Sequence, residues 1–254
     1  MGMSVFETDL VSLAVAIGTA VLAGLVKGLV GFALPMIFIS GLSLVLPPQL
    51  AIGALIIPTL FTNGFQALRQ GRAVALASIK RFRYYLVTGC LCLFLSAQFV
   101  LWLEPQMLFL LLGIPVTGFT LWQLIKADTT LIRQNPTKDA LVGGVAGLLG
   151  GISGIWGPPT VLYLTAIGTQ KATQIQVQGV IYGLGAVALT IAHIGSGVLQ
   201  TDSLSLSITL VAPALAGLWL GDRLQYRVDQ NRFRRLTLLI LLISGFNLLR
   251  RGLF

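Results

Sequence analysis

Charged residues are scarce in this chain: 10% of its 254 residues are Asp, Glu, Lys or Arg, whereas 56% are hydrophobic. A soluble globular chain usually carries about 25% charged residues. The apolar runs 86–103, 107–125 and 204–220 approach the length needed to cross a bilayer, about 20 residues. These runs lack a polar stripe at helical spacing, which excludes a core of soluble amphipathic helices. With a mean hydropathy of +0.89, the chain is predicted to be a membrane protein.

The membrane segments lack the strict apolar and polar alternation of a transmembrane β-barrel. The run 236–243, for example, is apolar on nearly every side chain, so it would present apolar groups to both faces of a strand. Helices and closed barrels are the two structures that can span a bilayer. The sequence therefore predicts an all-α polytopic membrane protein.

Residues for catalysis are also few. The chain has one histidine, His193, and two cysteines, Cys90 and Cys92, whose spacing of two turns them to different faces of a helix. The eight acidic residues lie near segment ends or in loops. An intramembrane enzyme needs a nucleophile with a base, or a metal cluster, at membrane depth. We therefore expect no enzyme, no metal and no cofactor, and the absence of a phosphate-binding P-loop excludes direct use of ATP.

Glycine and proline divide the chain into eight hydrophobic segments. Two halves are expected, residues 1–126 and 139–254, joined by a polar linker, 127–138. The first half has a broken segment, 9–46, then helices at 50–68, 84–103 and 106–126, with a basic loop at 69–83. The second half has a broken segment, 139–167, then helices at 173–198, 203–222 and 235–250.

The two halves repeat a short sequence. Residues 23–35 match residues 146–158 at six of thirteen positions with a constant offset of 123, and the matches include three glycines and the proline. Each copy opens a half. Two halves that each contain an interrupted helix are the pattern of secondary transporters.

The placement of Lys and Arg bears on how the segments cross the membrane. Eight single crossings, with loop 69–83 inside, put ten basic residues inside and six outside. If 139–167 enters and returns on the same side, the count becomes 14 to 2, which the positive-inside rule favours. If 9–46 behaves likewise, each half crosses an odd number of times and the halves are inverted repeats. Eight plain crossings with one external basic loop remain the alternative.

The two breaks carry the strongest indication of function. Glycine permits unusual backbone conformations and close approach, and proline ends the preceding helical turn. A helix that restarts after a break presents free amides and the positive end of its dipole, which suits an anion. The glycines could instead pack helices together. The candidate substrate-binding residues at the breaks are Gly28, Gly31, Pro35, Gly151, Ser153, Gly154, Trp156, Gly157 and Pro158.

Lys27 is the only Lys or Arg deep in a predicted membrane segment. A charge at that depth is costly and marks function by default. Because no acidic residue is expected at the same depth, an anionic substrate could supply the balancing charge. The alternative is that Lys27 reaches toward the membrane surface through its long side chain.

Polar side chains in the later helices could line a path for the substrate. Asn63 and Gln66 lie about one turn apart, as do Gln178 and Tyr182. Amides in lipid must face partners or a cavity, although each could equally join helices. His193 is a candidate for carrying a coupling proton, since histidine titrates near neutral pH. A hydrogen-bonded structural histidine is the alternative.

At the two breaks the sequence resembles the sulfite exporter TauE/SafE family. The resemblance lies in residues 24–35 (GLVKGLVGFALP), 147–159 (GLLGGISGIWGPP) and 217–224 (GLWLGDRL), and the order of segments agrees over nearly the whole chain. The resemblance implies movement of sulfite, sulfonate or related organosulfur anions across the bacterial plasma membrane.

The sequence thus predicts a multi-pass secondary transporter of a small sulfur-containing anion in the bacterial inner membrane. An anion channel, or a permease for another small organic anion, is the alternative. The expected partners are the anionic substrate and the lipid bilayer, with proton or sodium as the coupling ion. No nucleic acid is expected, because the basic residues of this +9 chain lie in loops between apolar runs. The sequence leaves a homodimer open.

Overall fold

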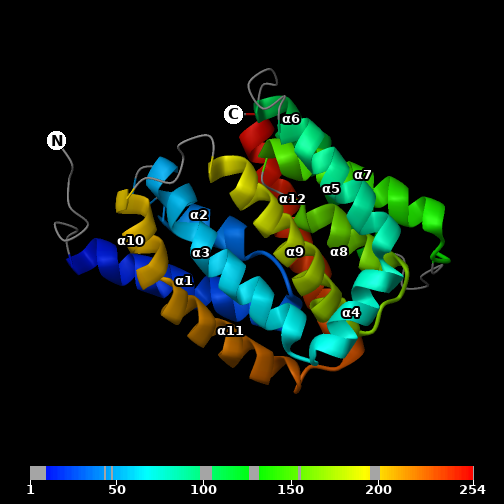
Figure 1. Cartoon of the computed structure of the whole chain (residues 1–254). Helices are drawn as coiled ribbons and strands as arrows, with labels where there is room; N and C mark the ends of the chain where they lie inside the picture. The colour runs from blue at the N-terminus through cyan, green and yellow to red at the C-terminus, as the bar shows by residue number, and fades with distance from the viewer. Residues whose placement is uncertain are drawn as a thin grey trace.

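The computed structural model describes residues 10–42, 44–46, 48–97, 105–125, 132–153, 156–194 and 201–253. Over these ranges the structure is all helical (Figure 1). The helices are α1 (Leu10–Val30), α2 (Leu34–Leu42), α3 (Pro48–Leu68), α4 (Arg72–Arg81), α5 (Arg83–Ala97), α6 (Pro105–Ile125), α7 (Pro136–Ser153), α8 (Gly157–Ala166), α9 (Lys171–Ile194), α10 (Thr201–Thr209), α11 (Val211–Gln225) and α12 (Gln230–Leu253).

Three stretches of the described chain are long and apolar enough to cross a membrane by themselves. They are α1, the stretch Leu204–Gln225 in α10 and α11, and α12. Large apolar side chains are also exposed on helix surfaces, as at Leu10, Ile125 and Ile243. Such apolar surface would be unusual on a soluble monomer, and it suits contact with lipid.

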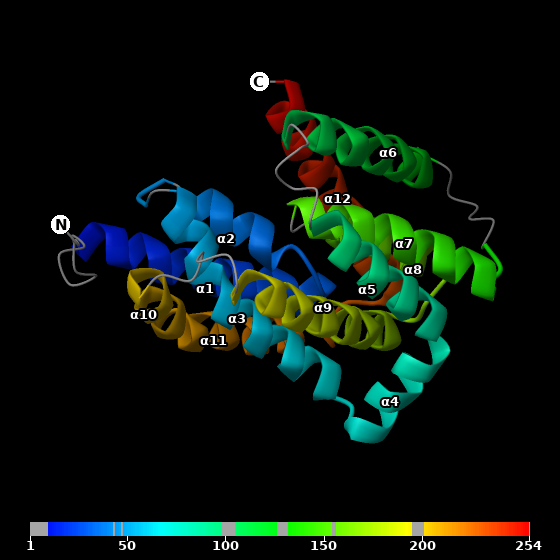
Figure 2. The same ribbon diagram turned by 45° about the horizontal axis from the view of Figure 1, so that its top comes forward.

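The first predicted broken segment folds as a helical hairpin. α1 ends at Val30, and Gly31 follows with φ of +91°, a conformation that glycine adopts without steric cost. The Gly31 amide donates to the Lys27 carbonyl at 2.7 Å, which closes the last turn of α1. α2 then begins at Leu34 and runs back along α1 (Figure 2), so that Gly41 packs against Thr19.

The second broken segment returns in the same way. α7 ends at Ser153 and α8 begins at Gly157, with Pro158 in its first turn. Near the end of α8, the Tyr163 hydroxyl donates to Asp139 at the start of α7, at 2.7 Å. α8 therefore ends on the side from which α7 started.

Two pairs of helices, α1 with α11 and α5 with α7, pack in parallel through glycines. A Cβ at Gly24 in α1 would lie 2.1 Å from the Ala214 carbonyl oxygen of α11. A Cβ at Gly147 in α7 would lie 2.1 Å from the Gly89 carbonyl oxygen of α5. Gly24 and Gly147 are the residues that the internal repeat aligns, so aligned positions make equivalent backbone contacts.

Two other pairs cross the halves in antiparallel fashion. In α3 and α9, Ala67 lies against Gly179, and Asn63 lies nearest Gly183. In α6 and α12, Gly113 packs on Leu249, and Gly252 packs on Leu110. The two helices of each pair therefore run in opposite directions where they pack.

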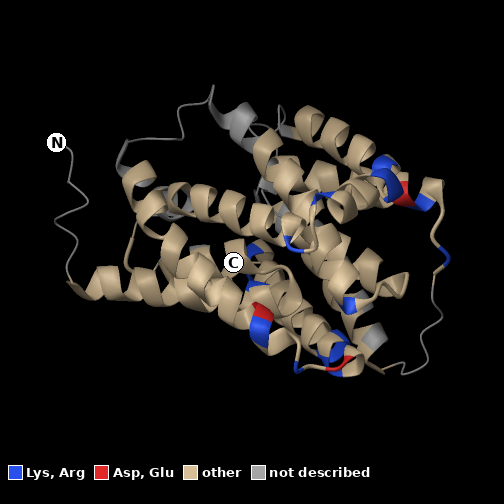
Figure 3. Cartoon of the chain, turned by 60° about the horizontal axis from the view of Figure 1, so that its bottom comes forward, with Lys and Arg blue, Asp and Glu red and all other residues tan. Residues whose placement is uncertain are grey.

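The basic segments gather at one end of the molecule. Most Lys and Arg lie away from the N-terminal end of α1 (Figure 3). The Gln70 amide donates to the Ala172 carbonyl at 3.1 Å, and the Lys171 amine donates to the Gln225 carbonyl at 2.9 Å. Loops 69–83 and 223–235, which eight single crossings would put on opposite sides, therefore lie together.

Two expectations from the sequence differ from the structure. The basic loop 69–83 contains a helix, α4, which buries Ala75 and Ser78 one turn apart against the rest of the protein. The expected single helix 203–222 is divided at Leu210 into α10 and α11. Pro213 explains the division, because it has no amide hydrogen to donate to the carbonyl four residues earlier.

Candidate functional site

Lys27 lies buried in the last turn of α1, at the first break. Only 2% of its surface is exposed. Its amine donates a hydrogen bond to the side-chain oxygen of Asn63 in α3, which is also buried. A neutral amide oxygen can accept a hydrogen bond from an ammonium group, but it brings no negative charge. Lys27 is thus held in place by α3 and leaves two amine hydrogens for other acceptors.

Two glutamines bind the backbone where α1 ends. The Gln66 amide nitrogen donates to the Gly31 carbonyl at 3.2 Å. The Gln178 side chain, with its nitrogen turned toward the break, donates to the Gly31 and Val30 carbonyls, each at 3.2 Å. The last carbonyls of a helix have no partner within the helix. Side chains from α3 and α9 supply these partners and fix the shape of the break.

Several polar atoms beside Lys27 are buried without a partner among the described residues. They include the Asn63 amide nitrogen and the Gln66 amide oxygen. Leaving a buried polar atom unsatisfied costs about 1–3 kcal/mol. The Asn63 nitrogen and the Lys27 amine are both hydrogen-bond donors, so together they suit an acceptor that carries negative charge.

Aromatic and hydroxyl side chains surround the second break. The Thr160 hydroxyl of α8 lies 2.6 Å from the Tyr85 hydroxyl and donates to the Trp156 carbonyl at 2.8 Å. The Tyr182 hydroxyl of α9 donates to the Gly157 carbonyl at 3.2 Å. Side chains from α5 and α9 therefore fix the start of α8.

α9 joins the two breaks. Gln178 contacts the first break and Tyr182 contacts the second, and the two residues are one helical turn apart. Four residues of α-helix span about 6 Å. Residues from both breaks also belong to one hydrophobic cluster, in which Phe32 and Ala33 pack together with Val161. Both interrupted segments therefore contact α9 within one turn of each other and contribute to one hydrophobic cluster.

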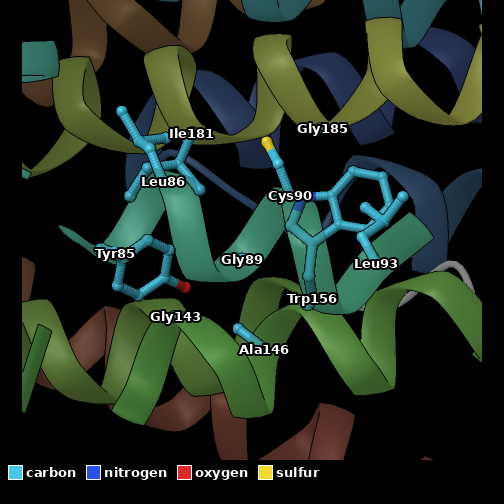
Figure 4. A pocket seen from close by; sticks show the side chains of 11 residues that line it. Tyr85, Leu86, Gly89, Cys90, Leu93, Gly143, Ala146, Trp156, Ile181 and Gly185 are labelled. Atoms are coloured by element: carbon cyan, nitrogen blue, oxygen red, sulfur yellow. The ribbon is translucent and has the colours of Figure 1, made fainter. Parts of the chain in front are cut away.

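A small apolar pocket lies beside the second break, between α5, α7 and α9 (Figure 4). Trp156 fits at one side of it, against Gly150 of α7 and Gly185 of α9, where a Cβ would crowd the indole. Tyr85 lies at the other side. A second, smaller cavity, too narrow to hold a water molecule, lies near the first break, between α1, α3 and α11.

Comparison with known proteins identifies the family. The model of the sulfite exporter TauE/SafE family matches residues 16–248, nearly the whole chain. The chain belongs to this family. As a TauE/SafE protein it is a membrane transport protein, and the family's role is sulfite export. No significant match is found among curated proteins or among solved structures.

In this TauE/SafE protein, five of the candidate residues gather at the first break. They are Lys27, Gly31, Asn63, Gln66 and Gln178. Pro35 lies in the first turn of α2. Gly28 faces away from this group, because a Cβ there would lie 2.3 Å from the Leu218 carbonyl oxygen of α11.

The candidates of the second break are more dispersed. Trp156, Gly157, Pro158 and Tyr182 lie together at the start of α8. Gly151 is buried in the last turn of α7. Gly154 and the side chains of Ser153 and His193 lie outside the described residues.

Sequence reasoning missed four residues at or near the site. Tyr85 and Thr160 bracket the second break. Arg69 and Asp222 form an ion pair beside the first. The 24–35 and 147–159 motifs do not include them, and nothing in one sequence indicates that α3 and α11 meet. The GLWLGDRL stretch, which carries Asp222, was the available signal.

Proposed function

We propose that this TauE/SafE protein is a secondary transporter that moves a small sulfur-containing anion, such as sulfite or a sulfonate, across the bacterial plasma membrane. One observation carries the proposal: Lys27 is buried at the first break with a neutral partner, Asn63. Burying an ammonium group costs several kcal/mol unless a counter-charge compensates. An anionic substrate would supply that charge during transport.

The donors near Lys27 suit an oxyanion. Lys27 offers a positive charge with two remaining hydrogens, and Asn63 offers an amide nitrogen that has no partner among the described residues. The first turn of α2 begins three residues after the break at Gly31 and adds free amides and a positive dipole end. Sulfite and sulfonates carry several oxygens around one sulfur, so they can accept from these donors at once.

Alternating access between two inverted halves, 1–126 and 139–254, joined by the linker 127–138, is the mechanism we propose. Three features support it: the antiparallel pairs α3 with α9 and α6 with α12, the hairpin return of both broken segments, and the equivalent contacts of Gly24 and Gly147. In transporters of this type the substrate lies between discontinuous helices, and one half rocks against the other.

Flux measurements in proteoliposomes test the proposal. The purified protein is expected to carry radiolabelled sulfite or sulfonate with saturable kinetics, and Lys27→Met is expected to abolish this flux because it removes the charge while keeping a similar volume. Lys80→Met, which removes an exposed charge from α4, is the matched control and is expected to keep wild-type flux. Wild-type flux in Lys27→Met would rule out Lys27 as a substrate-binding residue.

A further inference from the structure

An ion pair that is largely shielded from solvent joins the end of α3 to α11 close to the first break. Arg69 follows α3, three residues after Gln66, and its guanidinium lies 2.5 Å from the Asp222 carboxylate of α11. The side chains are 8% and 20% exposed, so the pair is largely shielded from solvent. A second ion pair of the described chain, Arg232 with Asp229, is far more exposed.

This ion pair closes one side of the small cavity near the first break. The cavity is lined by Gly28, Phe65, Gln66, Arg69, Leu218 and Asp222. Gln66 also holds the break through Gly31, and Asn63, about one turn before Gln66 in α3, accepts a hydrogen bond from Lys27. Arg69 and Asp222 therefore stand between the group around Lys27 and the basic end of the molecule.

The surroundings of Arg69 hold its guanidinium in a fixed position. A second nitrogen donates to the Gln225 side-chain oxygen at 3.2 Å and to the Tyr226 hydroxyl at 3.3 Å. The guanidinium also faces the Tyr226 ring at 5.9 Å from the ring centre. A planar guanidinium binds carboxylates and other oxyanions through paired hydrogen bonds. Asp222 thus occupies the place in which an oxyanion could bind Arg69.

We propose that Arg69 is an outer anion-binding residue of this transporter and that Asp222 occupies it when the site is closed. An anion from the basic end displaces the Asp222 carboxylate from Arg69, which separates α3 from α11 and opens the way to Lys27. The inference rests on the proposed function, since it names a second contact for the same substrate. Because the incoming anion replaces the Asp222 carboxylate, the Arg69 guanidinium keeps a negatively charged partner throughout.

Cysteine accessibility tests whether the ion pair closes the site. Gln66→Cys is made in a chain whose Cys90 and Cys92 are replaced by alanine, and a membrane-impermeant thiol reagent is added to inside-out vesicles. Asp222→Asn is expected to raise the rate of modification about tenfold or more, because it removes a charged hydrogen-bonded pair. Asp229→Asn, which breaks the exposed ion pair at the same end, is the matched control and should leave the rate unchanged. An unchanged rate in Asp222→Asn would overturn the inference.

A charge reversal tests whether Arg69 also binds the anion. Arg69→Asp combined with Asp222→Arg restores an ion pair, so the slow modification of the cysteine should return. Sulfonate flux should stay below a tenth of the wild-type rate, because the guanidinium now projects from α11. Wild-type flux in the reversed pair would show that Arg69 stabilises the structure without binding the anion, and it would overturn the inference. Faster modification in the presence of methanesulfonate, lost in Arg69→Gln, supports the inference even without flux, a result that would count against the proposed transport alone.

Discussion

Lys27 combines two properties that rarely occur together in a membrane protein: a formal charge and nearly complete burial. Replacing a buried charged group by an apolar one of similar volume is often neutral or stabilising, whereas removing its partner leaves a buried charge uncompensated and costs about 3–5 kcal/mol. Lys27 and Asn63 should therefore respond differently to substitution. The difference separates a residue kept for its charge from one kept for structure.

We expect Lys27→Met to keep the free energy of unfolding within about 1–2 kcal/mol of the wild-type value. The substitution removes the cost of burying a charge, and this gain offsets the cost of leaving the Asn63 side-chain oxygen without a donor. Asn63→Ala is expected to destabilise more, since it leaves the Lys27 ammonium without its hydrogen-bond partner. The measurement is the midpoint of thermal denaturation of the purified proteins in detergent. A larger loss of stability in Lys27→Met than in Asn63→Ala would mean that the charge of Lys27 serves the fold.

At this scale the structure brings together four polar residues that the sequence had indicated as candidates, and their role in binding a substrate stays a prediction. Polar residues in apolar segments stand out, which is how Lys27, Asn63, Gln66 and Gln178 were found. Gly28 looked equivalent to Gly31, but only the structure reveals that Gly28 packs on α11 while Gly31 forms the break. Both roles require a residue that has no side chain, so a single sequence does not distinguish a glycine that packs helices from one that forms a break.

At the scale of elements, α1 and α11 are held together by close backbone contact. A Cβ at Gly217 would lie 2.1 Å from the Val21 carbonyl oxygen, and one at Gly24 would lie equally close to Ala214. Small residues let membrane helices approach in this way, and packing takes the place of the hydrophobic effect between them. Gly18 also lies in α1, but a Cβ at Gly18 would have no neighbouring atom within 4 Å.

Gly24→Ala and Gly217→Ala should each destabilise the protein by about 1–3 kcal/mol, the usual cost of overpacking. Gly18→Ala should be neutral or stabilise by about 0.5–1 kcal/mol, because alanine is the better helix former where space is open. Unfolding of the three variants in a mixed detergent series gives the comparison. Equal stability of all three would show that α1 and α11 do not depend on this contact.

The order of the helices followed from the sequence, but α4 and the division between α10 and α11 did not. The breaks were expected from glycine and proline near residues 31 and 158, and the structure has helices ending and restarting there. The helix α4 was missed because its basic residues indicated a loop between membrane segments, although Ala, Leu, Lys and Arg are good helix formers, and its position depends on contacts of Ala75 and Ser78 with other elements. Such tertiary contacts are not recorded in local sequence.

For the whole molecule, contacts between loops determine which ends share a side of the membrane. Contacts join the loops at Gln70, Lys171 and Gln225, so their basic residues gather at one end. Positively charged loops face the cytoplasm. Arg250, near the C-terminus, lies at the far end of α12 from residue 230. The topology proposed for the inverted halves therefore puts Lys80 and Arg227 inside and Arg250 outside.

Single cysteines at these three exposed positions check the topology. In a chain without Cys90 and Cys92, an impermeant maleimide added to intact cells should label Arg250→Cys and leave Lys80→Cys and Arg227→Cys unlabelled. Permeabilised cells, in which all three should react, provide the control. Labelling of Arg227→Cys but not of Lys80→Cys in intact cells would support eight single crossings instead.

The central claim is that Lys27, at the first break, binds a small sulfur-containing anion. Isothermal titration of sulfite into the purified wild-type protein, Lys27→Met and Lys80→Met tests this claim without depending on direction or coupling. We predict saturable binding to the wild-type protein and to Lys80→Met, and none to Lys27→Met. Equal binding of sulfite to Lys27→Met and to the wild-type protein would contradict the account.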